Sequence, residues 1–444
     1  MPALRSPSFR EAVLWREEAP SPAGDTGPLP AEADVVVVGG GYCGMAAAWE
    51  LARRGRSVVL LEAHALGWGA SSRNGGMVIP ELKPGPAALE RTYGPLGLRL
   101  YAAVNEAFDF TEKVIAEHGI DCDYERTGQL YLAHHDRLLP HFHDLAHEHQ
   151  ALGEDVRFLD RISLASEIGS TLYPAGLVFE RTGGLQPARF HAGLVTLARR
   201  AGALLHDNTR ALELTRARAG YEIRTPRGRI RSAEVLLATN AYADEVSPRL
   251  RRGVLPVGSY IIATEPLDAG LADELSPHRR MFVDSKNFLF YWRVTPDGRM
   301  VFGGRRSLAA SSIAQAADFL YESMLRIHPQ LADTAITHAW GGNVAVTLDR
   351  LPHVGRNDGV LYATGCNGSG VALLTWLGTR LGAMVCGEAP PPFAELKHRA
   401  IPLLKGRDLY LPFVGLWFRW QDRGYPQRRG VRDRVAALTG RRRS

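Results

Sequence analysis

The clearest hydrophobic pattern lies near the N-terminal end, where four valines follow one another in the segment 34–38. An unbroken β-branched run of this kind predicts a strand that is buried on both faces, as parallel sheets require. A glycine-rich turn comes next, then a helical pattern over 45–54 that stops at Gly55, and a second apolar strand over 57–61. The spacing predicts a βαβ unit of about thirty residues.

The rest of the chain alternates between helical and strand patterns. Apolar residues at helical spacing predict helices at 98–120, 190–201, 317–327 and 371–385. Short apolar or alternating runs predict strands at 129–133, 177–180, 203–206, 221–225, 234–239, 260–264, 288–292, 300–302 and 360–364. This order predicts an α/β, doubly wound (Rossmann-type) domain and a second, mainly antiparallel α+β domain, both discontinuous in sequence.

The expected domain boundaries follow the change of pattern along the chain. They are 1–33 for an irregular lead-in, 34–85, 175–245 and 335–400 for the doubly wound domain, 86–174 and 246–334 for the second domain, and 401–444 for a C-terminal arm with a basic tail.

Composition narrows the class of protein. The 444 residues are 45% hydrophobic and 23% charged, which excludes wholesale disorder and collagen. The four cysteines form no C-x-x-C pair, which argues against a disulfide scaffold or a cysteine zinc site and favours a reducing compartment. No signal peptide or membrane span is predicted, so we expect a cytoplasmic protein.

The net charge of +6 is concentrated at one end of the chain. Residues 419–444 contain nine arginines and two aspartates, so the remainder is close to neutral. A basic tail can bind anionic lipid or nucleic acid. We favour the simpler interpretation of a solvated terminus and expect no nucleic-acid partner, with peripheral membrane contact as the weaker alternative.

The first turn of the βαβ unit has the chemistry of a dinucleotide site. Gly39, Gly41 and Gly44 have G-x-G-x-x-G spacing between the predicted strand and helix, and Glu62 ends the second strand. The glycines permit a tight turn, approach of a pyrophosphate to the backbone, and close helix–strand packing. Glu62 would accept hydrogen bonds from the adenosine ribose and repel a 2′-phosphate, so NADP is disfavoured.

Two further glycine-rich segments favour a cofactor longer than a simple nucleotide. The segment 67–76 carries serine, arginine and asparagine donors among its glycines, and 365–370 forms a second turn between a strand and a helix. Backbone N–H groups in such a turn could stabilise the negative charge of a reduced flavin.

The motifs together resemble the D-amino-acid-oxidase-type (DAO) FAD-dependent oxidoreductases. The resemblance rests on Val35-Val-Val-Val-Gly-Gly-Gly-Tyr-Cys-Gly44, Gly69-Ala-Ser-Ser-Arg-Asn-Gly-Gly76, Ala238-Thr-Asn-Ala-Tyr242, and Thr347-Leu-Asp-Arg-Leu-Pro-His-Val-Gly355 followed by Gly365-Cys-Asn-Gly-Ser-Gly370. It spans residues 30–390, and the R-N-G-G and Tyr-Cys-Gly variants look most like the gamma-glutamylputrescine oxidoreductase branch. It implies hydride transfer from a carbon bearing an amine to FAD, which gives an imine.

The resemblance also implies which residues bind FAD. The expected set is Gly39, Gly41, Tyr42, Gly44, Glu62, Ala63, Gly69, Ala70, Ser71, Ser72, Arg73, Asn74, Gly75, Gly76, Ala211, Thr239, Gly365, Asn367, Gly368 and Gly370.

Departures from the family pattern bear on the substrate. Val344 stands where glycine and D-amino acid oxidases carry the arginine that binds the substrate carboxylate. Gly76 and Ala372 replace the arginine and lysine of sarcosine oxidases, Gly342 replaces their flavin-linking cysteine, and Val301 falls near their oxygen-activating lysine. The resemblance therefore implies non-covalent FAD and an amine substrate without an α-carboxylate, with O₂ or another acceptor left open.

Candidate residues of the substrate pocket, in the catalytic region, come from the second domain and the sheet edge. They are Tyr260, Tyr291, Arg293, Arg305 and Trp340. Aromatic rings could hold an ammonium group, and an arginine could bind a distal carboxylate. Ordinary packing remains the alternative for each residue taken singly, and no general base is assigned.

Two other segments attract attention. Six histidines lie between 134 and 149, with His143 and His147 at the i, i+4 spacing of a metal site, but no carboxylate completes it and we expect an exposed helix without metal. The aromatic stretch 410–420 is either an interfacial membrane anchor or an arm packed on its own domain or on a partner subunit. We favour packing, because Pro412 and Gly415 should break an amphipathic helix.

The sequence thus predicts an FAD-dependent enzyme that oxidises a primary or secondary amine, of the gamma-glutamylputrescine type, to an imine. One alternative is an amino acid oxidase or dehydrogenase of the glycine or sarcosine oxidase type. An alternative from another class is a flavin-bearing binding protein that its basic tail docks to RNA or membrane.

Overall fold

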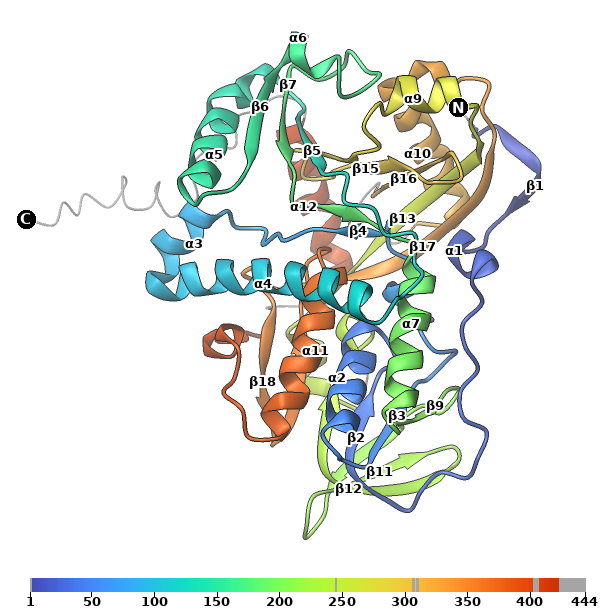
Figure 1. Ribbon diagram of the computed structural model, residues 1–444, viewed down its shortest axis with the longest axis vertical. Helices are drawn as coiled ribbons and strands as arrows, with labels where there is room; N and C mark the ends of the chain where they lie inside the picture. The colour runs from blue at the N-terminus through green and yellow to red at the C-terminus, as the bar shows by residue number, and fades with distance from the viewer. Residues whose placement is uncertain (1, 244–245, 306–307, 309–310, 402–406, 423–444) are drawn as a thin grey trace, which may run out of the picture.

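Two large β-sheets carry the fold, one toward each end of the long axis of the molecule (Figure 1). The computed structural model describes residues 2–243, 246–305, 308, 311–401 and 407–422. The basic tail beyond residue 422 lies outside the described residues.

The eight-stranded sheet contains the predicted βαβ unit. Its order is β10 (Glu213–Arg216), β11 (Tyr221–Thr225), β12 (Gly228–Leu237), β2 (Glu32–Val38), β3 (Val58–Leu61) and β9 (Leu204–His206), with β19 (Val360–Thr364) beside β12 and β18 (His353–Asn357) beside β19. Strands β19, β12, β2, β3 and β9 run parallel. This parallel core confirms the Rossmann-type part of the prediction.

The valines of β2 are buried on both faces, as their unbroken run predicts. Val35 and Val37 pack in one core with α2 (Tyr42–Arg53), α4 (Pro95–Glu117), α7 (Pro187–Arg200) and α11 (Val371–Val385). Val36 and Val38 face a second core that includes Ile223 of β11. Burial on both sides explains why β2 lacks alternating polar residues.

The nine-stranded sheet is mainly antiparallel, as expected for the second domain. Its order is β1 (Arg5–Arg10), β17 (Ile336–Val346), β13 (Leu255–Pro266), β16 (Arg299–Gly304), β15 (Tyr291–Val294), β14 (Met281–Asp284), β5 (Gln129–Ala133), β7 (Ala175–Phe179) and β6 (Val156–Asp160). Only the pairs β1–β17 and β14–β5 are parallel in this order. The helices packed on its strands include α5 (Leu139–Ala151), α6 (Arg161–Leu164), α9 (Ala269–Leu275) and α10 (Ile313–Ile327).

The remaining elements are short or lie between the sheets. They are the helices α1 (Leu14–Glu18), α3 (Pro86–Tyr93), α8 (Pro248–Arg252) and α12 (Arg407–Asp422), the paired strands β4 (Met77–Val78) and β8 (Gly183–Gly184), and the 3-10 turns η1 (Ala70–Ser72), η2 (Asp136–Leu138), η3 (Asn240–Tyr242), η4 (Pro329–Leu331) and η5 (Pro392–Glu395).

Sheet membership differs from the expected boundaries at two strands. Strand β7 falls in the range 175–245 and β17 in 335–400, both expected in the doubly wound domain, yet both are hydrogen-bonded into the nine-stranded sheet. A short apolar run looks alike in either sheet, so the local pattern does not tell which partner a strand takes.

The segment 1–33 is not irregular throughout, which corrects the expectation of an irregular lead-in. Strand β1 extends the nine-stranded sheet, and α1 buries Leu14 and Trp15. The Trp15 indole N–H donates to the carbonyl of Asn74, 2.9 Å away. These contacts join residues that are far apart in the sequence, so the local pattern of residues cannot predict them.

The C-terminal arm packs on the protein, as expected, but it does so as a helix that the expectation excluded. Pro412 and Gly415 lie inside one continuous helix, α12, instead of breaking it. Leu411 is buried in this helix, and Asp422 at its end accepts hydrogen bonds from Asn287. Tertiary contacts of this kind override weak local helix propensity.

Candidate active site

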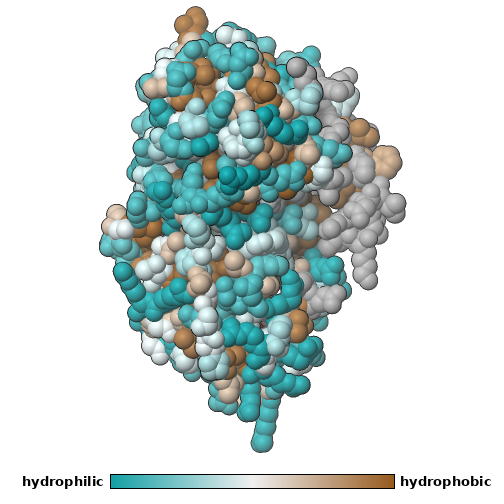
Figure 2. Space-filling model, turned by 90° about the vertical axis from the view of Figure 1, so that its right-hand side faces the viewer, coloured by the Kyte–Doolittle hydropathy of each residue, from teal (hydrophilic) through white to brown (hydrophobic). Residues whose placement is uncertain are grey.

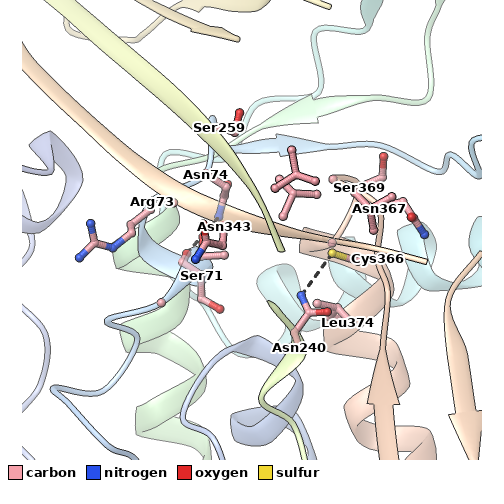
Figure 3. Close-up of a pocket in the computed structure, with 18 of the residues that line it drawn as sticks. Ser71, Arg73, Asn74, Asn240, Ser259, Asn343, Cys366, Asn367, Ser369 and Leu374 are labelled. Carbon is pink, nitrogen blue, oxygen red and sulfur yellow. Dashed lines mark hydrogen bonds between the residues drawn. The ribbon is translucent and has the colours of Figure 1, made fainter. Parts of the chain in front are cut away.

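A cavity of about 1000 Å³ opens where the two large sheets meet. Its lining includes the carboxyl ends of β2 and β3 and the residues that follow β2, β3 and β12, and it continues along β13, β15 and β17 of the other sheet. The carboxyl ends of parallel strands are where doubly wound folds bind their ligands. Figure 3 shows polar side chains from both sheets around this space.

The turn after β2 leaves backbone exposed at the start of α2. Gly39 has φ +108°, and a Cβ on Gly44 would collide with the carbonyl oxygen of Gly39, so strand and helix can approach only without side chains. A Cβ on Gly41 would lie 2.8 Å from the Ser71 hydroxyl oxygen. The Ser71 hydroxyl accepts from the Tyr42 N–H at 2.9 Å, so a serine oxygen lies at this helix N-terminus, a position that favours an anion.

Glu62 is held in the cavity wall by backbone donors. Its carboxylate accepts hydrogen bonds from the N–H groups of Gly40 at 2.7 Å and His64 at 3.0 Å. Burial raises its pKa, which the backbone donors partly counteract. The carboxylate keeps lone pairs that can accept hydrogen bonds from a ribose.

The loop 67–76 is shaped by its own side chains. Arg73 donates to the carbonyls of Trp68 at 2.7 Å and Gly341 at 3.1 Å, and its guanidinium lies over the Trp68 ring. Asn74 donates to the carbonyl of Ala70 and accepts from the N–H of Gly76 at 2.8 Å. In Figure 3 the end of Arg73 points away from the other labelled side chains, so this arginine braces the loop against β17.

The second glycine-rich turn is braced from β17 and η3. The Asn367 amide oxygen accepts from the N–H of Thr347 at 3.1 Å, and its amide nitrogen donates to the carbonyl of Gly365. Asn240 accepts from the N–H of Gly365 and donates to the thiol of Cys366, the dashed contact in Figure 3. Burial raises the pKa of the Cys366 thiol, which therefore stays protonated.

A small polar group stands at the end of the cavity formed by the nine-stranded sheet. The hydroxyls of Ser259 and Tyr291 are 3.1 Å apart, and Arg305 interacts electrostatically with Tyr291. Burial raises the pKa of Tyr291 and lowers that of Arg305. No hydrogen bond or ion pair to Arg305 is found within the described ranges.

Three of the five expected pocket residues lie behind the cavity wall. Tyr291 and Arg305 line the cavity, whereas Tyr260, Arg293 and Trp340 do not. The Tyr260 hydroxyl bonds to the backbone of Ser311. Arg293 donates to the carbonyls of Gly75 and Leu185, and the Trp340 indole donates to that of Arg73. Spacing along a strand could not separate these roles, because burial depends on what packs against each face.

Most of the expected cofactor residues line the cavity. They are Gly39, Gly41, Tyr42, Glu62, Ala63, Gly69, Ala70, Ser71, Arg73, Asn74, Gly75, Ala211, Thr239, Asn367, Gly368 and Gly370. Gly44, Ser72, Gly76 and Gly365 do not line it; they shape the turns from within, as when the Ser72 hydroxyl donates to the carbonyl of Gly67.

The cavity also includes residues that the sequence analysis did not select. They are His64, Trp68 and Arg210 near the nucleotide end, Asn240, Tyr242, Asn343 and Cys366 in the middle, and Glu81, Lys83, Lys286, Asn287, Phe288, Leu411, Val414 and Phe418 at the far end. Asn240, Tyr242 and Cys366 stand inside motifs that the resemblance used. The residues of α12 had no such signal.

Of the positions that depart from the family pattern, some line the cavity and others do not. Val344 and Gly342 line the cavity, while Gly76, Ala372 and Val301 do not.

The histidine-rich segment forms part of α5 and the turn before it. His143 stacks on Phe158, and His149 bonds to Glu154. Within the described ranges, no three His, Cys, Asp or Glu side chains gather closely enough to hold a metal ion.

Comparison with known proteins gives the family. The model of the FAD dependent oxidoreductase family (DAO) matches residues 34–384, most of the chain. The chain belongs to the DAO family. Related proteins include gamma-glutamylputrescine oxidoreductase of Escherichia coli K12, 31% identical over 86% of this chain and 90% of that protein. A probable oxidoreductase OrdL of Rhizobium meliloti is 32% identical over 88% and 92%.

Solved structures of two enzymes share the fold. Glycine oxidase from Geobacillus kaustophilus superposes with a TM-score of 0.72 at 22% identity, over 84% of this chain and all of that one. L-Proline dehydrogenase from P. horikoshii gives 0.69 at 20% identity, over 82% and 96%.

The DAO family member described here is therefore an FAD-dependent oxidoreductase. The cavity fits this cofactor, because the glycine turn at Gly41, the backbone-anchored Glu62 and the two glycine-rich segments lie along one continuous wall. No helix among residues 2–422, as far as they are described, has the length and apolar composition to span a bilayer.

Proposed function

We propose that the enzyme oxidises an amine whose reacting carbon bears no carboxylate, with a carboxylate elsewhere in the molecule. A gamma-glutamyl conjugate of a diamine has this chemistry, and a relative at 31% identity is named for such a substrate. The observation that carries the proposal is the contrast within one cavity between Val344 and Arg305. Val344 offers no charge to an α-carboxylate, while Arg305 is a cation without a bonded partner within the described ranges.

The polar group around Arg305 suits a distal carboxylate. Arg305 can supply parallel N–H donors, and the Tyr291 and Ser259 hydroxyls can add further hydrogen bonds. The raised pKa of Tyr291 keeps its hydroxyl a donor across the physiological range. A carboxylate there would also neutralise a cation that burial disfavours.

The reaction needs little acid–base chemistry from the protein. Bound FAD supplies the two-electron acceptor for a hydride from the amine carbon. The substrate nitrogen gives up a proton, and water hydrolyses the released imine. The chain orients the substrate by binding its distal carboxylate at Arg305 and Tyr291. The apolar side chains of Val257 and Val344 cover the site.

We further propose that FAD is held without a covalent bond, with the expected residues of the glycine turn after β2 and the two glycine-rich segments around it. Gly342, at the position of the sarcosine oxidases' linking cysteine, lines the cavity without a nucleophile. Acid precipitation should release all yellow cofactor into the supernatant, and colour that stays with the pellet would contradict this part.

The test is anaerobic bleaching of the flavin by a panel of substrates. We expect bleaching by gamma-glutamylputrescine, weaker bleaching by putrescine, and none by glycine or sarcosine. Admission of air then shows whether O₂ is the acceptor. Bleaching by α-amino acids alone would overturn the proposal and favour an amino acid oxidase.

Variants separate the role of Arg305 from a general effect. In Arg305→Gln, kcat/KM for the conjugate should fall about 100-fold, the cost of a lost charged hydrogen bond, while that for putrescine stays within about twofold. Arg326→Gln, which removes an exposed charge on α10, is the matched control. Equal losses for both substrates would contradict a carboxylate site.

A further inference from the structure

Helix α12 is docked on the cavity by one of its faces. Leu411, Val414 and Phe418 line the cavity, and Phe418 meets Phe288 edge-on with ring centroids 6.0 Å apart. At the end of the helix, the Asp422 carboxylate accepts from the backbone N–H groups of Asn287 at 2.8 Å and Phe288 at 3.2 Å. The helix is therefore part of the wall of the site.

The opposite face of α12 is also apolar, but it is exposed. Phe413 is 71% exposed, Leu416 57%, Trp417 49% and Trp420 49%. Their i, i+3, i+4, i+7 spacing places them in one stripe along the helix. Helix α12 lies behind the other elements in Figure 1, and Figure 2 shows a small group of apolar atoms in the upper part of the right-hand edge.

Such a stripe is unusual on a helix that already buries its other face. A helix that is apolar on both sides is normally covered on both sides. Large apolar side chains gathered on one surface mark a contact with a partner or a membrane. The aromatic side chains of the stripe favour a membrane, because tryptophan and phenylalanine are favoured at the bilayer interface.

The distribution of charge along the chain favours one of the possible partners of the stripe. Residues 423–444, which follow α12 directly, contain eight arginines and one aspartate, while residues 1–422 have 45 basic and 46 acidic residues. A second copy of the chain would bring the same positive segment to the contact. An anionic lipid surface complements it, since each arginine near such a surface is attracted to it.

We propose that the exposed stripe of α12, together with the basic segment after it, docks the enzyme on an anionic phospholipid surface. The stripe enters the interface while the arginines bind lipid headgroups. Because the inner face of the same helix lines the cavity, docking brings the wall of the active site next to the bilayer. This proposal does not depend on which amine the enzyme oxidises.

The test is co-sedimentation of the full-length FAD-loaded protein with vesicles. We expect binding to phosphatidylcholine vesicles that contain phosphatidylglycerol, and at least tenfold weaker binding to phosphatidylcholine alone, about the effect of losing several arginine–headgroup attractions. Raising the salt concentration should weaken binding, because the attraction is screened. A protein that stays in the supernatant with both kinds of vesicle would overturn the proposal.

Variants assign the binding to α12. The double substitution Phe413→Ser with Leu416→Ser should weaken vesicle binding about tenfold. Neither side chain lines the cavity, so turnover of a soluble amine should not change. The matched control is Ile162→Ser with Leu172→Ser, two exposed apolar residues outside α12.

Two outcomes would overturn the assignment to α12. One is an equal loss of vesicle binding in the control variant. The other is a dimer in light scattering that the α12 substitutions break while vesicles bind neither form, because a second copy of the chain would then cover the stripe.

Discussion

At the scale of single residues, a methyl group at Gly41, in the turn after β2, would press on the hydroxyl of Ser71. Gly41 combines a helix N-terminus with an open cavity, and a Cβ there would lie 2.8 Å from the Ser71 hydroxyl oxygen. We expect Gly41→Ala to weaken FAD binding about 30-fold, the effect of a clash costing about 2 kcal/mol. Flavin fluorescence titration of the apoprotein measures this. Gly27→Ala is the control, because nothing lies within 4 Å of a Cβ at that position, and equal affinity in both variants would contradict this role of Gly41.

Another residue-scale prediction concerns His328, which is fully buried beside Trp292. Burial lowers its pKa from 6.5 to about 4, and its imidazole contacts the carbonyl of Gly169. Between these pH values the unfolded chain binds a proton that the native state does not, so acidification from pH 6.5 to 4 destabilises the fold by about 3 kcal/mol through this group. Below pH 4 both states are protonated and the loss stops growing.

Denaturant unfolding of His328→Gln should reveal this contribution as a difference. The variant is less stable than the parent at pH 7, and the gap should narrow as the pH falls toward 4. A gap that stays constant over this range would show that His328 does not carry the proton.

At the scale of elements, the N-terminal helix α1 supports the flavin loop from outside the cavity. Trp15 packs edge-on against Trp340, lies under the Arg293 guanidinium and donates to the carbonyl of Asn74. Trp15→Ala should cost about 4 kcal/mol, as large-to-small changes in a core do. It should also weaken FAD binding, because Asn74 then loses its anchor. Thermal unfolding measures the loss of stability and FAD titration measures the loss of affinity, with substitution of an exposed residue, Leu4→Ala, as the control. Unchanged FAD affinity in Trp15→Ala would show that the flavin loop keeps its shape without Trp15.

Some helices and strands could be predicted from the sequence and others could not. Strand β2, helix α2 and strand β3 were predicted because each has a local signal, an unbroken apolar run for the strands and a glycine-rich turn before the helix. The family resemblance identified Arg73 and Asn74 as residues of the cofactor site. Helix α1 and helix α12 were missed because their partners, Asn74 and Asn287, are remote in the chain. Among the pocket candidates, strand periodicity gave the right strands, but hydrogen bonds to the carbonyls of Gly75 and Leu185 hold Arg293 outside the cavity lining, whereas Tyr291 is part of it.

At the scale of the whole molecule, one cavity joins two sheets that otherwise have separate cores. A ligand that spans it should couple them, whereas a ligand confined to the end near β2 and β3 should not. At about 100 times its Kd, either ligand adds about 2.7 kcal/mol to the free energy of unfolding, so global stability alone cannot separate the two cases. Local protection can, because each ligand should slow hydrogen exchange only in the segments that it holds together.

Hydrogen exchange of the apoprotein with saturating ADP or FAD makes this distinction. ADP should protect amides in 39–45 and 61–64, close to Gly41 and Glu62. FAD should protect these and also 70–76, 365–370 and strand β13, whose Val257 and Ser259 line the far half of the cavity. Strand β6, at the outer edge of the nine-stranded sheet, should exchange alike in both samples. If ADP protected β13 as well as FAD does, the sheets would be coupled through their direct packing; if FAD left β13 unprotected, the cofactor would not reach the second sheet, and the placement of the amine beside Tyr291 would fail with it.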